Sequence, residues 1–553
     1  MSELVVPTEY SRAGNTSHTG ELHAIQDNEQ FSYGTAGFRF PAEKLPFIVF
    51  RCAYVASLRA RQLNSAIGMM ITASHNPPSD NGVKLVDPGG DMLNKQWEKY
   101  SGEIVNATDS ELPAAVRAME RQITVSKTEK SRVVCGMDTR ASGPYLMAAA
   151  KAGAALFNVE FVDIGVVTTP MLHYAVKAYN EPEFAEPTHK GYYTSIAGAF
   201  NKLHEITVEP DESRYQHEIV LDCANGVGAP RFRNLLELIP EKFLRVNFFN
   251  ETGELNHECG ADFVKIAQKL PANFKSLNSL EKCASFDGDA DRLMYFRPKV
   301  AGKEEAELFD GDKIAVLIAT YICEHVKAYH QTKPRERLHL GIVQTAYANG
   351  SSTRYIREVL GLEPIIVPTG VKHLHEAATE YDIGIYFEAN GHGTVTFSEI
   401  FDRIIRRDTT GNISLRRLAL FSRVINETVG DAIADLLAVE IVLRHYGWSM
   451  DDWAEKLYKD MPNGQIKVPV EDRSIFKTTK DEQRLVKPLG IQKKIDEEVA
   501  KYKDSRAFIR PSGTENIVRV YAEADTIENT LQLGKSLEQL VLNLRDDYSE
   551  KLI

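Results

Sequence analysis

Short apolar runs, several of them rich in β-branched residues, recur along the chain, and each ends at a polar loop. The runs and their loops are Ile67–Ile71 before TASHN, Val133–Val134 before GMDTR, Ile219–Leu221 before DCANG, Cys283–Phe286 before DGDADR and Ile383–Phe387 before EANGH. Buried strands that end at polar loops and alternate with helical segments are typical of α/β layers whose sites lie at the carboxyl ends of strands. We therefore expect several α/β units.

Three longer segments have helical rather than strand-like spacing. Apolar positions recur every three or four residues in Pro46–Leu63, Leu415–Leu443 and Ile527–Leu544. An apolar stripe of this period faces a core. The first two segments are expected to cover sheets, and the third to end a smaller C-terminal α+β segment.

The length of the chain indicates several domains. It has 553 residues, well beyond the usual size of one domain. Turn-rich breaks lie at residues 181–193, 297–304 and 446–452, where Pro, Gly and polar residues gather. They predict four segments, whose bounds are 1–180, 181–297, 298–446 and 447–553.

The net charge of −12 opposes binding to nucleic acid or to anionic membranes, so a phosphate site would require a local cluster of cations. Six scattered cysteines without close pairs indicate a reduced, intracellular protein. We find neither a basic leader followed by an apolar stretch nor a run long enough to span a membrane. A cytosolic protein without nucleic-acid or membrane partners is expected, and its oligomeric state is left open.

The loop TASHN places Ser74 directly after an apolar run, with His75 and Lys84 nearby in sequence. A hydroxyl beside cations suits covalent phosphoryl chemistry, because positive charge stabilises a phosphoryl group on its oxygen. Ser74 is the candidate nucleophile. The alternative is a Ser/Asn/Pro turn that serves only the shape of the backbone.

The loop DGDADR presents three carboxylates at alternate positions, Asp287, Asp289 and Asp291. They can converge on one hard divalent cation and leave room for a phosphate oxygen, which fits Mg²⁺ best. An EF-hand is excluded, because Arg292 follows where glycine is needed and Pro298 stands where glutamate is needed. A solvated acidic turn is the other alternative.

The motif RPSGTEN combines an arginine fork, two hydroxyls and the amides of a glycine-containing turn. Arg510, Ser512, Gly513 and Thr514 can therefore form a compact anion cradle, typical of a phosphate that is held rather than transferred. The same residues also suit a salt bridge beside a capped turn.

Three further loops offer polar groups. In EANGHGT, Glu388 and Asn390 can hydrogen-bond sugar hydroxyls and His392 can move a proton, although a single histidine is more often structural. No spacing of His and Cys supports zinc. Arg39 in YGTAGFR faces either a phosphoryl group or solvent. The loop DTRASG at 138–143 is interpreted equally well as part of the site or as scaffold.

Together and in this order, the loops resemble the α-D-phosphohexomutase family, and FEANGHGT is similar to its eukaryotic N-acetylglucosamine branch. The matching motifs run from Tyr33 to Tyr521. Asn390, where other branches usually carry serine, and the position of Ser74 close to the N-terminus both suit that branch. The resemblance implies four domains around a central cleft, namely three similar mixed α/β domains and a smaller α+β domain. In chain order they would bear the phosphoserine, the metal, the sugar site and the phosphate cradle.

The resemblance also implies roles for individual residues. Ser74 would carry phosphate and contact one Mg²⁺ held by Asp287, Asp289 and Asp291, with Arg292 beside them. Arg39 and Lys84 would lie near the phosphoserine. The sugar would be bound by Glu388, Asn390 and His392, and the phosphate that is not transferred by Arg510, Ser512, Gly513 and Thr514. The general acid or base is left open among His392, Lys84 and His75.

The resulting expectation is an isomerase that converts N-acetylglucosamine 6-phosphate into the 1-phosphate on the route to UDP-N-acetylglucosamine. Phospho-Ser74 and a 1,6-bisphosphate that turns end for end would carry the phosphate. Closure of the C-terminal domain would exclude water, with a hinge near Tyr446–Asp452. The alternatives are a mutase for glucose or mannose phosphate, a metal-dependent phosphatase and a phosphosugar sensor. The intact Ser74, Lys84 and aspartates argue against the sensor.

Overall fold

The computed structural model describes residues 5–124, 129–157, 159–274, 282–300, 303–513 and 516–549, with side chains described up to 544. Its internal contacts divide the chain into two compact units. Unit 1 comprises Met1–Asp310, Asn390–Thr394 and Arg416–Ser449, and unit 2 comprises Gly311–Ala389, Val395–Leu415 and Met450–Ile553.

The first sheet of unit 1 has the strand order β1-β3-β2-β4-β5. Its strands are β1 (Phe38–Pro41), β2 (Ala66–Ile71), β3 (Asp80–Val86), β4 (Arg132–Met137) and β5 (Glu160–Val166). Strands β2, β4 and β5 are parallel, whereas β3 is antiparallel to β1 and β2. Because β2 and β4 are parallel neighbours, the loops that follow them open at the same edge of the sheet.

Helix α1 (Pro46–Leu63) has the bounds that its periodicity predicted. Proline occupies its first turn, where no amide hydrogen is needed, and Asn64 ends it in the left-handed conformation with φ 49°. It packs against the sheet and against α4 (Gly143–Ala155). The other helices that precede the second sheet are η1 (Thr8–Tyr10), η2 (Ala42–Lys44), α2 (Lys95–Asn106), α3 (Leu112–Glu120), α5 (Thr169–Asn180) and α6 (His189–Ile206).

The second sheet of unit 1 has the order β10-β9-β8-β6-β7. Its strands are β6 (Glu218–Asp222), β7 (Arg245–Phe249), β8 (Cys283–Phe286), β9 (Leu293–Pro298) and β10 (Ala306–Phe309). The helices beside them are α7 (Gly228–Leu236), α8 (Ala261–Ala267) and α14 (Ala432–Tyr446). The predicted boundary at 297/298 falls inside β9, which pairs with β10. This sheet therefore ends at Phe309.

Unit 2 contains a sheet of the order β12-β11-β13-β14. Its strands are β11 (Leu340–Thr345), β12 (Ile365–Val367), β13 (Ile383–Phe387) and β14 (Gly393–Phe397), of which the first two residues of β14 belong to unit 1. In chain order this is the arrangement of β6 to β9, so the two sheets are built alike without a visible sequence repeat. The accompanying helices are α9 (Gly311–Thr332), α10 (Gly350–Tyr355), η4 (Ile356–Leu360), α11 (Val371–Ala378), α12 (Glu399–Arg407) and α15 (Met450–Lys456). Helix α13 (Ile413–Val424) begins in unit 2, and its residues from Arg416 onward belong to unit 1.

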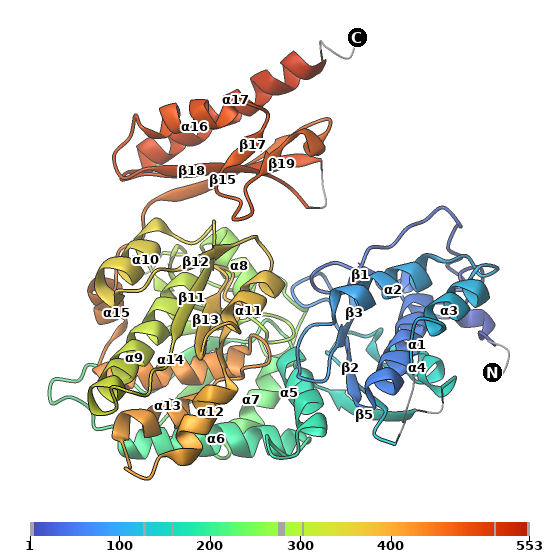
Figure 1. Cartoon of the computed structure of the whole chain (residues 1–553), viewed down its shortest axis with the longest axis horizontal. Helices are drawn as coiled ribbons and strands as arrows, with labels where there is room; N and C mark the ends of the chain where they lie inside the picture. The colour runs from blue at the N-terminus through green and yellow to red at the C-terminus, as the bar shows by residue number, and fades with distance from the viewer. Residues whose placement is uncertain are drawn as a thin grey trace. The chain divides into compact units, whose positions relative to one another are not determined.

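The end of the chain forms a smaller antiparallel sheet, β15-β19-β18, with helices on one face (Figure 1). Its elements are β15 (Asn463–Pro469), η5 (Arg473–Ile475), the hairpin β16 (Lys477–Thr478) and β17 (Leu485–Lys487), α16 (Ile491–Val499), β18 (Arg506–Pro511), β19 (Ile517–Glu523) and α17 (Ile527–Ser549). Alternate residues Val518 and Val520 of β19 pack against Leu533 and Leu537 of α17. The predicted fold class, mixed α/β with a smaller α+β segment, is confirmed.

The helical spacing predicted in Leu415–Leu443 is confirmed, but it belongs to two helices, because the chain breaks between α13 and α14. Thr428 hydrogen-bonds the side chain of Asn426, and the Asp431 carboxylate accepts from the backbone of Ile433 and Ala434 as the cap of α14. Apolar Val429 is buried within the break, so the apolar period continues through it. Periodicity alone therefore could not reveal the break.

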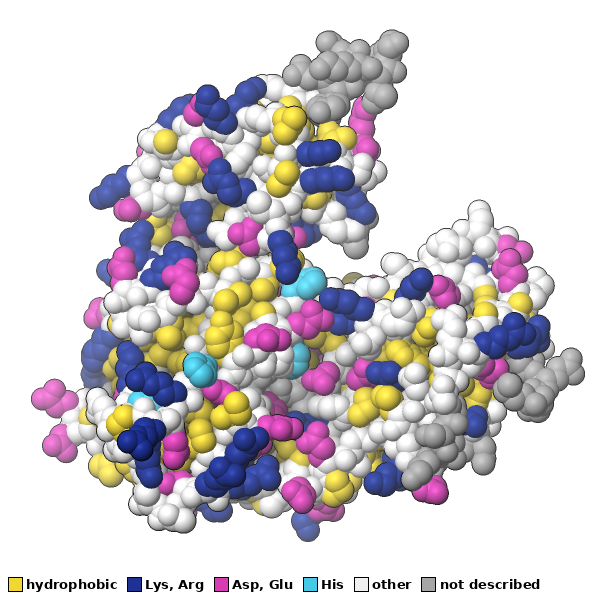
Figure 2. All heavy atoms as spheres, viewed as in Figure 1, with side chains coloured by type: hydrophobic (Ala, Val, Ile, Leu, Met, Phe, Trp, Pro, Cys, Tyr) yellow, Lys and Arg dark blue, Asp and Glu magenta, His cyan; other side chains and the backbone are white. Residues whose placement is uncertain are grey.

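The four-segment division itself stays a prediction. The chain passes from unit 1 to unit 2 between Ser449 and Met450, inside the stretch predicted to be a hinge, and the hinge motion also stays a prediction. All six cysteines are buried and unpaired. Within the described residues, no helix is both long and apolar enough to cross a membrane. Figure 2 shows acidic and basic side chains interspersed over the face it draws.

Candidate active site

Ser74 lies in the loop after β2 and is fully buried. Its backbone has φ 52°, a left-handed conformation that costs a residue other than glycine roughly 1–3 kcal/mol and persists only where the surroundings impose it. The Ser74 amide donates to Thr72 Oγ1 at 2.9 Å, and Ser74 Oγ donates to Asp287 Oδ2 at 2.7 Å. The structure thus joins the predicted nucleophile to the predicted metal loop.

Arg140 holds the shape of this serine loop. Its guanidinium donates to four backbone carbonyl oxygens of the loop, those of Ser74, Asn76, Pro77 and Asp80. Asp138 pairs with Arg140 at 3.0 Å and accepts from Thr72 Oγ1 at 2.7 Å, with all three side chains buried. Of the two interpretations of the DTRASG loop, the contacts favour a scaffold that acts directly on the loop of Ser74.

Replacing Arg140 by lysine is expected to lower kcat by about 10²-fold, the loss that a displacement of roughly 1 Å at a reacting group can cause. Lysine keeps the charge but cannot donate to four carbonyl oxygens from one planar group. Steady-state kinetics and the thermal unfolding midpoint would be measured for both proteins. A lower kcat with an unchanged midpoint indicates a displaced serine loop, whereas a lower midpoint indicates loss of folding. The exposed Arg121→Lys is the matched control, and an Arg140→Lys variant with the wild-type kcat would contradict the role.

The three aspartates of DGDADR lie together at the end of β8. One oxygen from each of Asp287, Asp289 and Asp291 falls within 4.8 Å of the others, and all three residues are buried. Asp287 Oδ1 accepts from the amides of Asp291 and Arg292 at 3.0 and 3.2 Å, and Ala290 turns the chain with φ 57°. The loop therefore directs its carboxylates to one point.

A divalent cation fits this arrangement. Asp289 Oδ1 and Asp291 Oδ1 are buried and have no hydrogen-bond partner among the described residues, a costly condition for carboxylate oxygens. Burial, together with the charges of Asp291 and Asp289, raises the pKa of Asp287 well above its ordinary value. A bound cation would remove this repulsion and satisfy the two oxygens.

Thr169, at the start of α5, fixes the middle aspartate. Thr169 Oγ1 donates to Asp289 Oδ2 at 2.5 Å, and the Thr169 amide donates to the Asp289 carbonyl oxygen at 3.1 Å. These two bonds leave Asp289 Oδ1 for a metal. Outer residues that orient metal ligands in this way tune the affinity of the site.

Two predicted cations lie on neighbouring strands beside the triad. Lys84 Nζ on β3 is 3.7 Å from Asp291 Oδ2, and Arg39 Nη1 on β1 is 3.1 Å from His75 Nε2. Arginine has no acceptor, so His75 Nε2 accepts and Nδ1 carries the hydrogen. His75 Nδ1 then donates to Asp262 Oδ2 at 2.7 Å, so both ring nitrogens of His75 are engaged.

Asp262, on α8, joins the two loops of the site. It binds His75 of the serine loop and accepts from Arg292 Nη1 at 2.5 Å. Burial alone would raise the pKa of Asp262, but the hydrogen bond from His75 and the charge of Arg292 lower it to about 2. Asp262 is therefore ionised wherever the protein is folded near neutral pH.

Replacing Asp262 by asparagine is expected to lower the free energy of unfolding by about 2 kcal/mol at pH 7. The folded-state pKa lies below the unfolded value, so this stabilisation is present above about pH 4 and is lost as pH falls toward 2. Urea denaturation of both proteins at pH 7 and pH 3 would measure the difference. The difference in unfolding free energy between the two proteins should be smaller at pH 3 than at pH 7. A larger difference at pH 3 would contradict the lowered pKa of Asp262.

His392 supports the metal loop from another segment of unit 1. It is buried, and its Nδ1 donates to the Asp291 carbonyl oxygen at 2.7 Å. Asn390 Oδ1 accepts from the His392 amide at 2.9 Å, and Gly391 turns between them with φ 89°. The predicted sugar residue Glu388 follows β13 and belongs to unit 2.

The predicted phosphate cradle lies at the end of β18 in unit 2. Arg510 is directly opposite Arg519 in the β18–β19 ladder, a like-charge pair that an anion would stabilise. The Ser512 amide donates to the Ile517 carbonyl oxygen at 2.9 Å, and Gly513 follows it. Thr514 lies outside the described residues.

The sequence motifs did not indicate Thr169, Asp262 or Asn256. Asn256 Nδ2 donates to the Ser74 carbonyl oxygen at 2.9 Å. Each of the three acts on a loop distant in sequence, and none stands in a chemical motif. An acid at the first turn of a helix, as Asp262 is, has too many ordinary roles to have been selected.

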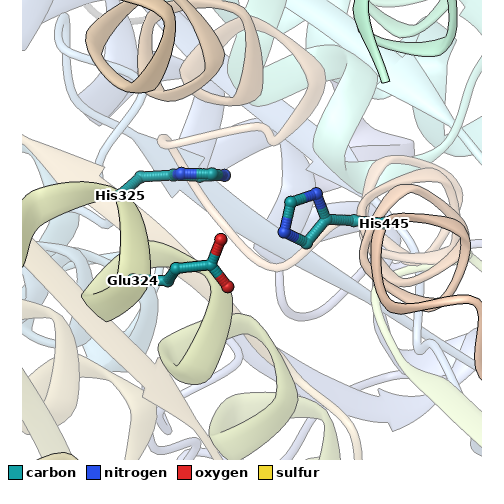
Figure 3. A group of neighbouring side chains, drawn as sticks. All are labelled: Glu324, His325 and His445. Atoms are coloured by element: carbon teal, nitrogen blue, oxygen red, sulfur yellow. The ribbon is translucent and has the colours of Figure 1, made fainter. Parts of the chain in front are cut away.

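Figure 3 draws three other side chains, with Glu324 and His325 on α9 and His445 on α14. The first two belong to unit 2 and the third to unit 1. No site is assigned to them.

Family models match most of the chain. They are the phosphoglucomutase/phosphomannomutase alpha/beta/alpha domain I at residues 52–112 and 105–186, phosphoacetylglucosamine mutase AMG1 domain II at 184–294 and domain III at 310–448, and the phosphoglucomutase/phosphomannomutase C-terminal domain at 466–537. In chain order, the matched segments contain the serine loop, the aspartate triad, the loop with Glu388, Asn390 and His392, and the predicted phosphate cradle.

Relatives that align over nearly the whole chain are named phosphoacetylglucosamine mutase. The phosphoacetylglucosamine mutase of Candida albicans is 45% identical over 540 residues, which cover 94% of this chain and 97% of the relative. That of Homo sapiens is 42% identical, with 96% and 97% covered.

Solved structures of N-acetylglucosamine-phosphate mutases are similar to this chain in fold and in sequence. A crystal structure of N-acetylglucosamine-phosphate mutase in the substrate complex has a TM-score of 0.87 at 44% identity and covers 93% of this chain and 97% of its own. The Aspergillus fumigatus enzyme with GlcNAc-6P and magnesium has a TM-score of 0.86 at 41% identity, with 94% and 97% covered.

Proposed function

The chain belongs to the phosphoacetylglucosamine mutase family of the α-D-phosphohexomutase superfamily, and on this premise we propose that it interconverts N-acetylglucosamine 6-phosphate and 1-phosphate. It is an isomerase that moves a phosphoryl group within one sugar. The observation that carries the proposal is the hydrogen bond from Ser74 Oγ to Asp287 Oδ2 at 2.7 Å, which supports one buried site for the proposed nucleophile and the proposed metal ligands.

Mg²⁺ is the cofactor that fits the donor set. Asp287, Asp289, Asp291 and an oxygen on Ser74 would hold one ion, and the bound ion supplies positive charge to the phosphoryl oxygens. All four ligands are oxygens, which hard cations prefer.

The chain's own residues account for both half-reactions. Phospho-Ser74 gives its phosphoryl group to O1 of the 6-phosphate sugar, so the bond from phosphorus to Ser74 Oγ breaks as the bond to O1 forms. The O1 proton passes to a base, for which Lys84 and His392 are the candidates. The resulting 1,6-bisphosphate turns end for end, and the bond from phosphorus to O6 then breaks as the bond to Ser74 Oγ forms again. The base returns its proton to O6, which becomes the free hydroxyl of the product. Lys84 and Arg39 stabilise the moving charge.

The cradle holds the phosphate that is not being transferred. Arg510, Ser512, Gly513 and Thr514 would bind the 6-phosphate in the first half-reaction and the 1-phosphate in the second. An arginine fork beside hydroxyls and amides suits either phosphate, because it recognises the group and not its position on the sugar. Glu388 and Asn390 would read the sugar hydroxyls.

The small phosphosugar is the proposed partner, in the cytosol and without nucleic acid or membrane. The acidic net charge and the six buried thiols support this location. The reaction would supply N-acetylglucosamine 1-phosphate to the synthesis of UDP-N-acetylglucosamine.

A direct assay tests the reaction. Mg²⁺-dependent conversion of N-acetylglucosamine 6-phosphate would be followed with glucose 6-phosphate as competitor. Preference for the acetylated sugar is expected. Preference for glucose phosphate would assign the chain to a different specificity, and release of inorganic phosphate as the main product would make it a phosphatase.

A further inference from the structure

The turn of the β16–β17 hairpin carries an acid that contacts the cradle. Glu482 Oε2 accepts from the Thr369 amide at 3.0 Å and from Thr369 Oγ1 at 2.6 Å. The same oxygen lies 3.4 Å from Arg510 Nε. One carboxylate oxygen of unit 2 therefore joins the loop after β12 to the predicted phosphate cradle.

This contact differs from an ordinary surface ion pair. The side chains of Glu482 and Arg510 are 18% and 12% exposed, so water screens their attraction only in part. Glu482 has φ 59°, a left-handed conformation that its surroundings must impose. Its amide donates to the Thr479 carbonyl oxygen at 3.0 Å, which closes the turn that presents the carboxylate.

The charge of Glu482 stands beside the group that a phosphate needs. The Arg510 guanidinium also lies over the Tyr347 ring, 5.7 Å from its centroid, so the ring and the carboxylate flank it. A phosphate that enters the cradle must either displace the Glu482 carboxylate from Arg510 or bind beside another negative charge. Both cases lower the affinity for phosphate relative to an unpaired arginine.

From these contacts, and resting on the proposed role of the cradle, we propose that the Glu482 carboxylate occupies Arg510 in the free protein and competes with the substrate's phosphate for it. It holds Arg510 and Thr369 together in the free protein and yields Arg510 when the phosphate arrives. Arginine binds phosphate through two parallel hydrogen bonds, whereas its Nε contact with Glu482 is a single ion pair. The exchange therefore favours the phosphate and releases the hairpin turn from Arg510, while the hydrogen bonds of Thr369 to Glu482 remain.

The surroundings leave room for this release. A cavity of about 540 Å³ lies between the turn and the end of β12, lined by Val367, Pro368, Ala377 and residues 479–481 among others. The turn can therefore shift without first breaking a packed core. On the β12 side the cavity wall is formed by residues 365–368, all of them apolar.

The test measures binding without turnover. In a Ser74→Ala background, the Kd of N-acetylglucosamine 6-phosphate would be measured by calorimetry with and without Glu482→Gln. Glutamine keeps an oxygen for Thr369 but removes the charge, so binding is expected to tighten about two- to fivefold, the factor that an ion pair of this kind corresponds to. Asp481→Asn is the matched control, because Asp481 is an acid of the same turn whose carboxylate binds Thr479 and Gln483.

The Arg510→Ala variant distinguishes failure of the proposed role of Glu482 from failure of the proposed phosphate cradle. Strong loss of binding in Arg510→Ala, with tightening in Glu482→Gln that disappears in the double variant, is the expected pattern. Weaker or unchanged binding in Glu482→Gln, while Arg510→Ala loses binding, overturns the role of Glu482 and leaves the cradle intact. Unchanged binding in Arg510→Ala would overturn the cradle itself. Unphosphorylated N-acetylglucosamine should bind all variants alike, and thermal midpoints would verify folding.

Discussion

Replacing Ser74 by alanine is expected to lower kcat by at least about 10⁴-fold, the scale of loss when a covalent nucleophile is removed. The variant has no oxygen to carry the phosphoryl group, and the hydrogen bond to Asp287 is also lost. The rate of N-acetylglucosamine 1-phosphate formation in the presence of Mg²⁺ and a sugar bisphosphate would measure the effect.

The control for this variant lies on the same loop. Ser79 is exposed, so Ser79→Ala should retain nearly the wild-type kcat. Ser74→Ala removes only one buried hydroxyl, and its unfolding midpoint should stay close to that of the wild type. A well-folded Ser74→Ala protein with undiminished activity would contradict covalent transfer through this residue.

Replacing Asp289 by asparagine is expected to weaken binding of Mg²⁺ by about 100-fold or more, since even changes outside the ligand set weaken metal sites roughly 10- to 100-fold. Asparagine keeps the shape and an oxygen for Thr169, but it removes the charge from the site. Mn²⁺ binding followed by electron paramagnetic resonance, beside Mg²⁺ titration of activity, would measure it. The exposed Asp211→Asn serves as control, and wild-type metal affinity in Asp289→Asn would contradict the assigned site.

The local sequence pattern was sufficient to predict those strands and helices whose bounds depend on one short segment. The runs Cys283–Phe286 and Ile383–Phe387 are confirmed as β8 and β13 at their stated bounds, because each is a compact apolar segment bounded by polar residues. Pro46–Leu63 is confirmed for a similar reason, with a proline start and an asparagine end. The break between α13 and α14 depends on side-chain caps and on buried Val429, which apolar spacing does not distinguish from helix.

In the site, too, residues that stand in a local motif could be predicted, whereas residues that act through distant contacts could not. Ser74 and the aspartate triad stand in motifs whose chemistry can be read from residue types, and the structure brings them within one hydrogen bond. Asp262 and Thr169 could not be selected in this way, because their function lies in which distant loop they touch. Arg140 was undecided between site and scaffold, and its four carbonyl contacts favour the scaffold.

The order of the strands explains why sequence motifs meet at all. β8 is parallel to β6 and antiparallel to β9 in the second sheet, while β2 is parallel to β4 in the first. Loops that leave the carboxyl ends of such strands carry polar residues to one edge of each sheet. The hydrogen bond between Ser74 and Asp287 shows that these two edges meet within unit 1.

Transfer of a labelled phosphoryl group through Ser74 tests the central claim most directly. The protein would be charged with ³²P-labelled glucose 1,6-bisphosphate, digested and mapped, and a second portion would be chased with unlabelled N-acetylglucosamine 6-phosphate. The account predicts label on the peptide that contains Ser74 and its rapid passage into sugar phosphate during the chase. Label that stays on the protein, lies on another residue or leaves only as inorganic phosphate would contradict the account.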